Sequence, residues 1–481
     1  MQPVIGGRRV SSKSDKTVDC VSPADGKRLY VLPAGSAHDV DAAVQAGRAA
    51  FDLGPWPQFS PMVRKSMLFG FADLIDKHRD ELALYGATEM GKPISAALSD
   101  VFATAHIIRY YAEFADKVVG STGASAASLV QYNVREPRGV VAALVSWNYP
   151  LPNAALKIGP ALAAGNAVVL KPSELASSSS LRLGELAAEA GIPEGVYSVV
   201  PGLGSTVGVA LATHKGVDLV AFTGSTATGH ALMKAVGLSS LKQVQLECGG
   251  KSANIVFADC GDLAVVAQDA AGRIFTNQGQ LCVAGTRLIA HKSIKDALVA
   301  AVQACAEGLS VGDPLDPATN FGPLASRARM DAVLRHVRSG SAAGAKLRTG
   351  GKQTRTDSQG FFVEPTVFDN VTPEMEIAQA DIFGPVLSVM SFDTADEAVA
   401  LANSTPYGLS ASVWTKDLAT AHTMIRRLKA GRVTVLASPP NPAAFGFPMG
   451  AEPFGQSGFG AEGGREGFEA FTRLKAVEIN I

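Results

Sequence analysis

The chain has 481 residues, of which 47% are apolar and 18% charged, with 43 Lys and Arg against 44 Asp and Glu. This composition is typical of a globular protein with a large core, and it excludes collagen-like and intrinsically disordered chains. A formal net charge of −1 gives the chain as a whole no electrostatic reason to bind nucleic acid or an anionic membrane. No apolar run reaches the roughly 18 residues of a membrane helix, and the first residues lack the apolar core of a secretory signal.

Five cysteines are spread along the chain, at Cys20, Cys248, Cys260, Cys282 and Cys305. An odd and sparse set excludes a disulfide framework, and neither a CxxC pair nor closely spaced histidines indicate a metal site. We therefore expect reduced thiols in a cytoplasmic protein without a metal centre.

The first quarter of the chain is predicted to be mostly helical. Ala-rich and amphipathic stretches fill residues 38–118, with Asp39 as the expected N-cap of the first helix. Breaks at 54–57 and at Gly91-Lys92-Pro93 divide the region into three helices, of which the last is expected to run from Ile94 to about Val118.

From residue 140 onward, short apolar runs alternate with helical stretches. Continuous runs such as 140–145 and 167–170 are typical of strands buried in a parallel sheet. A second series of this kind starts near residue 253 and continues through 386–390. The alternation predicts an α/β protein with two doubly wound, Rossmann-like lobes that divide near 249–251.

Two glycine-rich stretches follow predicted strands and are candidates for a phosphate-binding loop. The spacing at 202–208 is GxGxxxG, which departs from the dinucleotide fingerprint and is more simply a turn. At 222–229, Gly224 and Ser225 open a helix whose backbone N–H groups and dipole favour a phosphate, unless Ser225 is only an N-cap.

Four further residues combine reactive chemistry with a favourable place in the fold. Lys171 and Glu174 follow a buried strand, at the sheet edge where ligands bind in this class, although a solvated loop pair is the alternative. Cys282 follows Gln278-Gly279-Gln280, which indicates a close backbone approach, yet a lone buried Cys is usually inert. Glu247 is followed by Cys248 and then by two glycines. This pattern indicates either a carboxylate that another group approaches closely or a simple turn.

Together these motifs resemble the aldehyde dehydrogenase superfamily over essentially the whole length of the chain. Any one motif is weak, but six in family order are very specific. They are Trp147-Asn148-Tyr149-Pro150, Lys171-Pro172-Ser173-Glu174, Phe222-Thr223-Gly224-Ser225, Glu247-Cys248-Gly249-Gly250-Lys251, Gly279-Gln280-Leu281-Cys282 and Ile382-Phe383-Gly384-Pro385.

The resemblance implies an oxidoreductase that converts an aldehyde to its carboxylic acid with hydride transfer to NAD(P). It assigns Cys282 as the nucleophile that forms a thiohemiacetal and then a thioester, and Asn148 as the amide that stabilises the oxyanion. Glu247 would activate the hydrolytic water, and Lys157 would assist proton movement near the thiol.

The resemblance also implies the cofactor contacts, which are Trp147, Lys171, Glu174, Gly224, Ser225, Asp381 and Phe383. A carboxylate at Glu174 would repel a 2′-phosphate, so NAD is favoured and NADP stays open. Asp381 stands where the family usually has Glu, which is one methylene longer. Cys248 stands where Leu is usual, and we expect it to pack in the interior, because neighbouring strand residues face opposite sides.

The substrate channel implied by the resemblance is lined by Tyr149, Asn153, Leu156, Leu281 and Val283. Leu156 stands where many relatives carry Trp, and Asn153 adds one amide to an otherwise apolar wall. We therefore expect a medium-sized aldehyde with a distal polar group, either aliphatic or aromatic.

Alternating residues predict an exposed hairpin around 119–137 and a strand at 475–479 near the C-terminus. In the family these elements mediate oligomerisation, so a homodimer or homotetramer is expected. The predicted domains are an NAD-binding domain, a catalytic domain and the oligomerisation arm, at 1–118 with 138–249, at 250–450, and at 119–137 with 451–481.

Two alternative functions remain. A CoA-acylating semialdehyde dehydrogenase shares the Cys and hydride steps, but it typically lacks the general base that Glu247 supplies. A catalytically silent structural relative is the second alternative, and the joint presence of Cys282, Asn148 and Glu247 argues against it.

Overall fold

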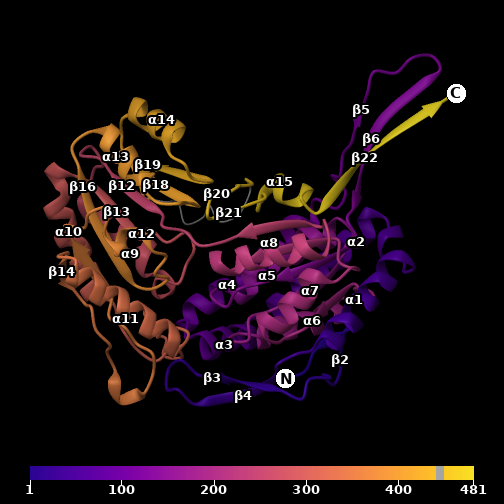
Figure 1. Ribbon diagram of the computed structural model, residues 1–481, viewed down its shortest axis with the longest axis horizontal. Helices are drawn as coiled ribbons and strands as arrows, with labels where there is room; N and C mark the ends of the chain where they lie inside the picture. The colour runs from indigo at the N-terminus through magenta and orange to yellow at the C-terminus, as the bar shows by residue number, and fades with distance from the viewer. Residues whose placement is uncertain (440–448) are drawn as a thin grey trace.

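The computed structural model describes residues 1–439 and 449–481 and contains two open α/β sheets with a thin β arm that projects beyond them (Figure 1). Residues 440–448, which fall within the predicted catalytic domain, lie outside the described residues. The sheet topology confirms the α/β class expected from the sequence. Among the described residues, no helix combines the length and the apolar character that crossing a bilayer requires.

The first sheet is built around parallel strands from the N-terminal half of the chain. Its strands are β1 (Val4–Ile5), β2 (Arg8–Arg9), β7 (Val140–Leu144), β8 (Ala167–Lys171), β9 (Tyr197–Val199), β10 (Leu219–Thr223), β11 (Gln243–Glu247) and β21 (Gly458–Phe459). Their order is β2-β1-β9-β8-β7-β10-β11-β21, with β1 and β21 antiparallel to their inner neighbours. The carboxyl ends of β7, β8, β10 and β11 therefore meet at one edge.

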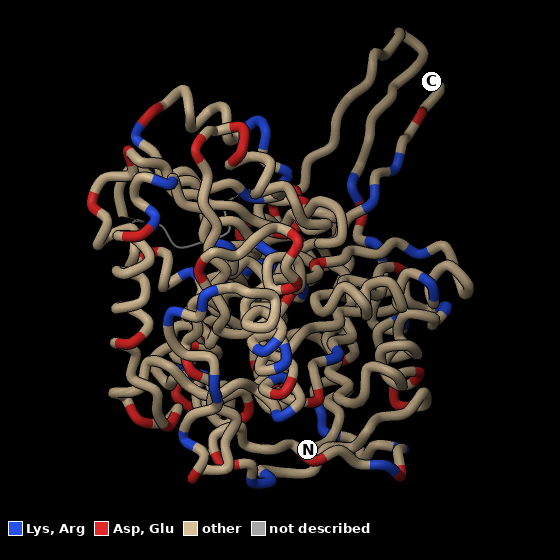
Figure 2. The backbone as a smooth tube through the Cα atoms, turned by 60° about the vertical axis from the view of Figure 1, so that its left-hand side comes forward, with Lys and Arg blue, Asp and Glu red and all other residues tan. Residues whose placement is uncertain are grey.

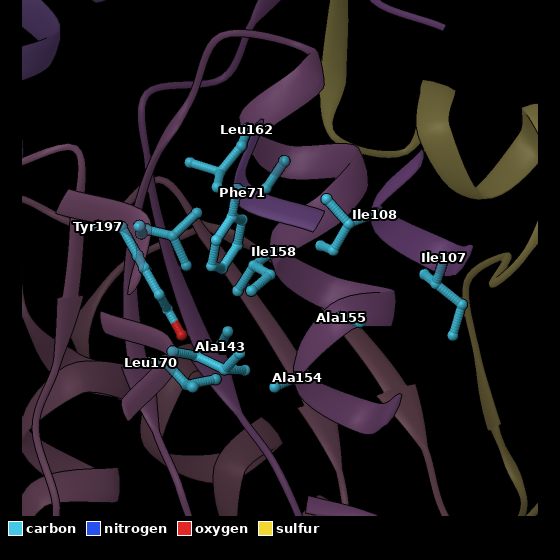
Figure 3. Packing of buried hydrophobic residues seen from close by; sticks show 14 of the residues in the cluster. Phe71, Ile107, Ile108, Ala143, Ala154, Ala155, Ile158, Leu162, Leu170 and Tyr197 are labelled. Atoms are coloured by element: carbon cyan, nitrogen blue, oxygen red, sulfur yellow. The ribbon is translucent and has the colours of Figure 1, made fainter. Parts of the chain in front are cut away.

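Helices cover both faces of the first sheet (Figure 1). They are α1 (Ala37–Asp52), α2 (Pro61–Lys77), α3 (Arg79–Met90), α4 (Ile94–Ala112), α5 (Pro150–Ala163), α6 (Ser178–Glu189), α7 (Val209–Thr213) and α8 (Thr226–Ser239). On β7, Val141 and Ala143 pack against α2, α4, α5 and α6, and Figure 3 shows Ala143 in this layer. Val140 and Ala142 face α1, α7 and α8. Because both faces are covered, the strand is apolar throughout.

The second sheet repeats this construction in the C-terminal half. Its strands, in spatial order, are β14 (Lys346–Thr349), β15 (Thr366–Asp369), β16 (Val386–Phe392), β13 (Arg287–His291), β12 (Ala253–Val256), β18 (Ser410–Trp414) and β19 (Arg432–Leu436). Its covering helices include α9 (Leu263–Phe275), α10 (Lys292–Glu307), α11 (Arg327–Ala342), α13 (Ala395–Ala402) and α14 (Leu418–Arg427). Leu288 and Ala290 pack with α9 and α10, whereas Ile289 faces α11, α13 and α14.

The projecting arm consists of β5 (Ser121–Thr122), β6 (Leu129–Pro137) and β22 (Thr472–Asn480). The long pair is antiparallel and runs in continuous register from Thr472 opposite Pro137 to Asn480 opposite Leu129. Figure 2 shows the arm standing clear of both lobes from a second direction. The predicted hairpin and C-terminal strand are thus confirmed.

Two short antiparallel pairs complete the described strands. They are β3 (Thr17–Val21) with β4 (Arg28–Pro33), and β17 (Tyr407–Gly408) with β20 (Phe454–Gly455).

Two local expectations are wrong. The N-cap of α1 is Ser36 rather than Asp39, because the Ser36 hydroxyl accepts a hydrogen bond from the Asp39 N–H at 3.2 Å. Asp39 lies in the first turn, where a carboxylate is favoured by the helix dipole. Helix α4 ends at Ala112 instead of near Val118, because the N–H groups of Phe114 and Ala115 bond three residues back, as in successive turns.

Candidate active site

A cavity of about 620 Å³ lies at the edge of the first sheet where its parallel strands end, which is where open α/β sheets bind ligands. Residues after β7, β8, β10 and β11 line it, together with residues from the second lobe. The predicted residues that it brings together are Trp147, Asn148, Lys171, Glu174, Gly224, Ser225, Glu247, Cys282, Asp381 and Phe383. In the described part of the chain, the lining does not include Lys157, Tyr149, Asn153, Leu156, Leu281 or Val283.

Cys282 follows a tightly folded loop at the end of α9. Asn277 and Gln278 adopt left-handed backbone conformations with φ of 53° and 57°, and Gly279 follows at 70°. A Cβ on Gly279 would lie 2.2 Å from the carbonyl oxygen of Gly384, so only glycine fits there. The close backbone approach expected from the sequence before Cys282 is confirmed.

The thiol of Cys282 and the carboxyl group of Glu247, which both line the cavity, both have raised pKa values. Burial, reinforced by the charges of Glu247, Glu462 and Asp381, raises the pKa of the Cys282 thiol to about 12. Burial also raises the pKa of the Glu247 carboxyl well above its ordinary value; Glu462 raises it further and Lys157 lowers it. A base that takes the thiol proton is therefore needed before Cys282 can act as a nucleophile.

Asn148 connects the end of β7 to the cysteine loop. Its Nδ2 donates to the carbonyl oxygen of Gln280 at 2.9 Å, and Asn277 Nδ2 donates to the Asn148 carbonyl oxygen at 3.1 Å. The Asn148 side chain is buried, and it lines the cavity.

Lys157 is buried on α5 beside the cavity, and its ammonium group donates to a carboxylate oxygen of Glu462. Glu462 lies three residues after β21 (Gly458–Phe459). Lys157 and Glu462 both act on the pKa of the Glu247 carboxyl, and Glu247 and Glu462 both act on the pKa of the Cys282 thiol.

The edge of the cavity at β8 and α8 carries charged and polar groups. Lys171 Nζ lies 3.4 Å from Glu174 Oε2, and burial lowers the pKa of the Lys171 ammonium while Glu174 raises it. Ser225 is the N-cap of α8, and its hydroxyl accepts from the Thr228 N–H at 3.2 Å. Ser225 is thus an N-cap, and it also lines the cavity.

The opposite end of the cavity is formed by the loop before β16. Phe383 adopts a φ of 52°. Its ring packs edge-on against the Trp147 ring, with the two ring centroids 5.4 Å apart. Burial raises the pKa of the Asp381 carboxyl, while the cations Lys251 and Arg329 lower it. The Asp381 carboxylate lies so close to the backbone that a Cβ on Gly249 would be 2.3 Å from its Oδ2.

The five predicted channel residues are not gathered in one described cavity. Tyr149 lies under the Lys92 ammonium, which sits 3.5 Å from the ring centroid. Leu156 is buried in the core of the first lobe, Leu281 packs against the core of the second, and Val283 is exposed. Asn153 Nδ2 donates to Ser146 Oγ at 2.9 Å, so this nitrogen is engaged within the protein.

Sequence reasoning missed several lining residues. Arg329 on α11 and Tyr407 on β17 border the cavity, and Gly204 and Gly208 bring the less favoured glycine-rich stretch to it. Arg329 and Tyr407 carry no local signal beyond their residue type, whereas Gly204 and Gly208 belong to the stretch at 202–208, the weaker of the two phosphate-loop candidates in the sequence.

Cys248 packs in the core, with its Sγ 2.9 Å from where a Cβ on Gly229 would lie, but it also borders the cavity. Because β11 ends at Glu247, strand alternation does not reach Cys248.

The chain belongs to the aldehyde dehydrogenase family, whose family model matches residues 10–477. The NADP/NAD-dependent aldehyde dehydrogenase PuuC of Escherichia coli K12 is 44% identical over 478 residues, covering 99% of this chain and 95% of PuuC. A mutant of the P. syringae indole-3-acetaldehyde dehydrogenase AldA in complex with NAD+ and IAA has a TM-score of 0.97 at 44% identity, covering 100% and 96% of the two chains. The gamma-glutamyl-gamma-aminobutyraldehyde dehydrogenase from Burkholderia cenocepacia has a TM-score of 0.96 at 45% identity with the same coverage. These likenesses confirm the enzyme class expected from the motifs.

Proposed function

We propose that this enzyme oxidises an aldehyde to its carboxylic acid through a covalent intermediate on Cys282. One observation carries the proposal: Cys282, Glu247 and Asn148 line the same cavity as the residues expected to hold a dinucleotide. The Cys282 thiolate attacks the aldehyde carbon to give a thiohemiacetal, whose oxyanion receives hydrogen bonds from Asn148 Nδ2 and the Cys282 N–H. Removing one such donor typically lowers kcat by about 100- to 1000-fold.

The residues present fit NAD. The carboxylate of Glu174 and the ammonium of Lys171 suit a ribose, the N-terminus of the 14-residue helix α8 suits a phosphate, and Asp381 suits the second ribose. When bound, NAD would accept the hydride. The loss of this hydride from the thiohemiacetal leaves a thioester. The Glu174 carboxylate would repel a 2′-phosphate, so we infer a preference for NAD over NADP.

Glu247 is proposed to take the Cys282 proton and later to activate the water that hydrolyses the thioester. A carboxyl group with a raised pKa is a better base for both steps than an ordinary carboxylate, because its pKa lies nearer the working pH. The Lys157–Glu462 pair beside it offers a route for the proton away from the thiol. With this base in place, transfer of the acyl group to CoA is not required.

We propose that the aldehyde approaches along Tyr149, Leu281 and Val283, with Leu156 behind this wall. A medium-sized aldehyde with a distal polar group, either aliphatic or aromatic, fits such a surface. Two of the similar structures, an indole-3-acetaldehyde dehydrogenase and a gamma-glutamyl-gamma-aminobutyraldehyde dehydrogenase, are consistent with this range.

The domain roles are part of the same proposal. Residues 1–118 and 138–249 would hold the dinucleotide, 250–450 would supply the nucleophile, and 119–137 with 451–481 would join subunits. The exposed apolar side chains of Leu474 and Ile479 on β22 support a homodimer or homotetramer, and the five free thiols support a reducing compartment such as the cytoplasm.

The test is NADH formation by purified protein over a panel of aldehydes, run in parallel with NAD and NADP and without CoA. Cys282→Ser should abolish the signal, whereas Cys305→Ser, a matched change at a thiol outside the cavity, should keep it. If wild type and Cys282→Ser produced NADH equally, or if CoA were required, the proposed function would be wrong.

A further inference from the structure

The side-chain amide of Asn148 is fixed at its oxygen by two donors. Ser146 Oγ donates to Asn148 Oδ1 at 2.7 Å, and Asn153 Nδ2 donates to the same oxygen at 3.3 Å. Asn153 Nδ2 also donates to Ser146 Oγ at 2.9 Å. The three side chains therefore form a closed ring of hydrogen bonds beside the cavity that Ser146 and Asn148 line.

This ring decides which way the amide faces. With Oδ1 occupied, Nδ2 points to the cysteine loop and donates to the carbonyl oxygen of Gln280, two residues before Cys282. A half-turn of the amide would bring Oδ1 against that carbonyl oxygen and Nδ2 against the Asn153 Nδ2. Both contacts are repulsive, because carbonyl oxygens only accept hydrogen bonds and amide nitrogens only donate them. One orientation is therefore strongly favoured.

Both donors stand on rigid parts of the fold. The Asn153 N–H donates to the Tyr149 carbonyl oxygen at 2.9 Å in the first turn of α5, and every other residue of that helix is buried. Ser146 lies two residues after β7, and the preceding Val145 N–H donates to the Lys171 carbonyl oxygen at 3.1 Å. The ring is thus held by a buried strand and a buried helix.

We propose that Ser146 and Asn153 are positioning residues that preset the amide of Asn148 for the oxyanion. The inference rests on the proposed function, because it takes Asn148 Nδ2 as a donor to the developing charge. A donor that is already oriented costs no reorganisation when the charge forms, which is why fixed donors are effective. The amide of Asn153 acts in this way on Asn148, rather than on the distal group of the aldehyde.

A double-mutant design tests this role. Ser146→Ala, Asn153→Met and their combination are made both in the wild type and in Asn148→Ala. The combination should lower kcat about 10-fold in the wild type. This loss should be smaller than the loss of about 100-fold or more expected for Asn148→Ala, which removes the donor itself. In Asn148→Ala the same changes should alter kcat by less than about twofold, because the group that they orient is gone. Ser146→Thr keeps the hydroxyl and should keep kcat.

Two measurements other than NADH formation distinguish a loss of Asn148 orientation from a general loss of structure. Hydrolysis of p-nitrophenyl acetate without NAD should fall in parallel, since an oxyanion forms there too, while the Kd for NAD measured by calorimetry should stay at the wild-type value. The matched control is Ser412→Ala, which breaks an equivalent bond from Ser412 Oγ to Asn254 Oδ1 (2.9 Å) in the second sheet. It should lower the Tm without changing kcat.

Two outcomes would overturn the inference. One is an equal loss of kcat in the wild type and in the Asn148→Ala background. The other is an Asn153→Met variant that changes only the discrimination between polar and apolar aldehydes, which would return Asn153 to the substrate channel. Failure of the proposed function is distinguishable, because it would show as wild-type protein without Cys282-dependent NADH formation.

Discussion

Lys157 donates a partly buried hydrogen bond to Glu462, a residue 305 positions later in the chain. The pair joins α5 of the first lobe to the turn after β21, and both charges act on Glu247. They act with opposite signs, because Lys157 lowers the pKa of the Glu247 carboxyl and Glu462 raises it.

The first prediction uses these opposite signs. Lys157→Met should raise the pKa of Glu247, so less of the base is ionised at neutral pH, kcat falls about 10-fold, and the acid limb of the pH–rate profile moves to higher pH. Glu462→Gln should move the same limb to lower pH. The measurement is kcat against pH, with Lys295→Met as a control at a lysine that pairs with Asp369 in the other lobe. Limbs that moved in the same direction for both variants would contradict this account.

The second prediction concerns the thiol itself. Because burial raises the pKa of Cys282 to about 12, the thiolate is scarce at pH 7 and its fraction grows about tenfold for each pH unit below that value. Alkylation of Cys282 by iodoacetamide, followed by mass spectrometry without NAD, should still be accelerating at pH 10. Free cysteine in the same tube, with a pKa of ~8.5, should level off above about pH 9. A Cys282 curve that levels off with free cysteine would show an ordinary thiol.

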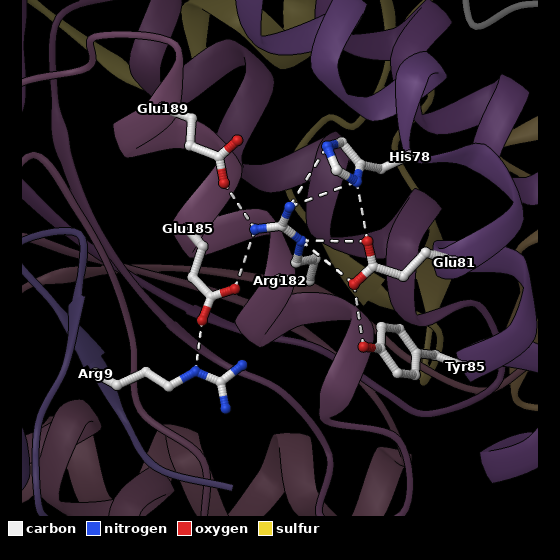
Figure 4. Close-up of polar contacts among 7 residues, drawn as sticks. All are labelled: Arg9, His78, Glu81, Tyr85, Arg182, Glu185 and Glu189. Atoms are coloured by element: carbon white, nitrogen blue, oxygen red, sulfur yellow. Dashed lines mark hydrogen bonds and ion pairs between the residues drawn. The ribbon is translucent and has the colours of Figure 1, made fainter.

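The third prediction concerns a surface network that ties α3 to α6. Arg182 reaches Glu81, Glu185 and Glu189 at 3.4, 3.1 and 2.8 Å (Figure 4). Because Arg182 is mostly buried and central, Arg182→Gln should lower the free energy of unfolding by about 1 kcal/mol, whereas Arg9→Gln at the exposed edge should cost less.

The same network carries a pH dependence. Although burial opposes it, hydrogen bonding from His78 and the charge of Arg182 lower the pKa of Glu81. A carboxyl with a lowered folded-state pKa stabilises the fold above its unfolded value and loses that contribution as pH falls. Urea titrations should therefore show the gap between wild type and Arg182→Gln narrowing below about pH 4. A gap that stayed constant down to pH 3 would exclude Glu81 as the source.

The strand ends of the candidate site were predictable, whereas its long-range pairs were not. Lys171 and the stretch at Gly224 each follow an apolar run, and parallel strands must end at the same edge, so their meeting in one cavity followed from the pattern. The pairing of Lys157 with Glu462 depends on how a turn after β21 approaches α5, which no local periodicity encodes.

Hydrogen-bond direction was likewise hidden in the sequence. The sequence predicted Asn153 to be a polar group in the apolar wall of the substrate channel. Its side-chain nitrogen instead points toward Ser146 and Asn148, because the start of α5 at Pro150 fixes the direction of the side chain. The predicted N-cap of α1 and the predicted end of α4 were wrong for a similar reason. A cap or a turn is decided by single hydrogen bonds rather than by the apolar pattern.

The last prediction compares Gly279, in the loop before Cys282, with Gly272, in the preceding helix α9. Gly279→Ala places a Cβ 2.2 Å from the Gly384 carbonyl oxygen at a φ of 70°, so the cysteine loop must shift. Left-handed strain and the clash together should lower the free energy of unfolding by about 2–4 kcal/mol and slow NADH formation at saturating NAD. Gly272→Ala lies within α9 with nothing within 4 Å of the added Cβ, and it should stabilise the protein by about 0.5–1 kcal/mol with kcat unchanged. Urea unfolding and kcat of both variants decide the matter, because equal stability of the two would mean that Gly279 is not held against Gly384 in solution.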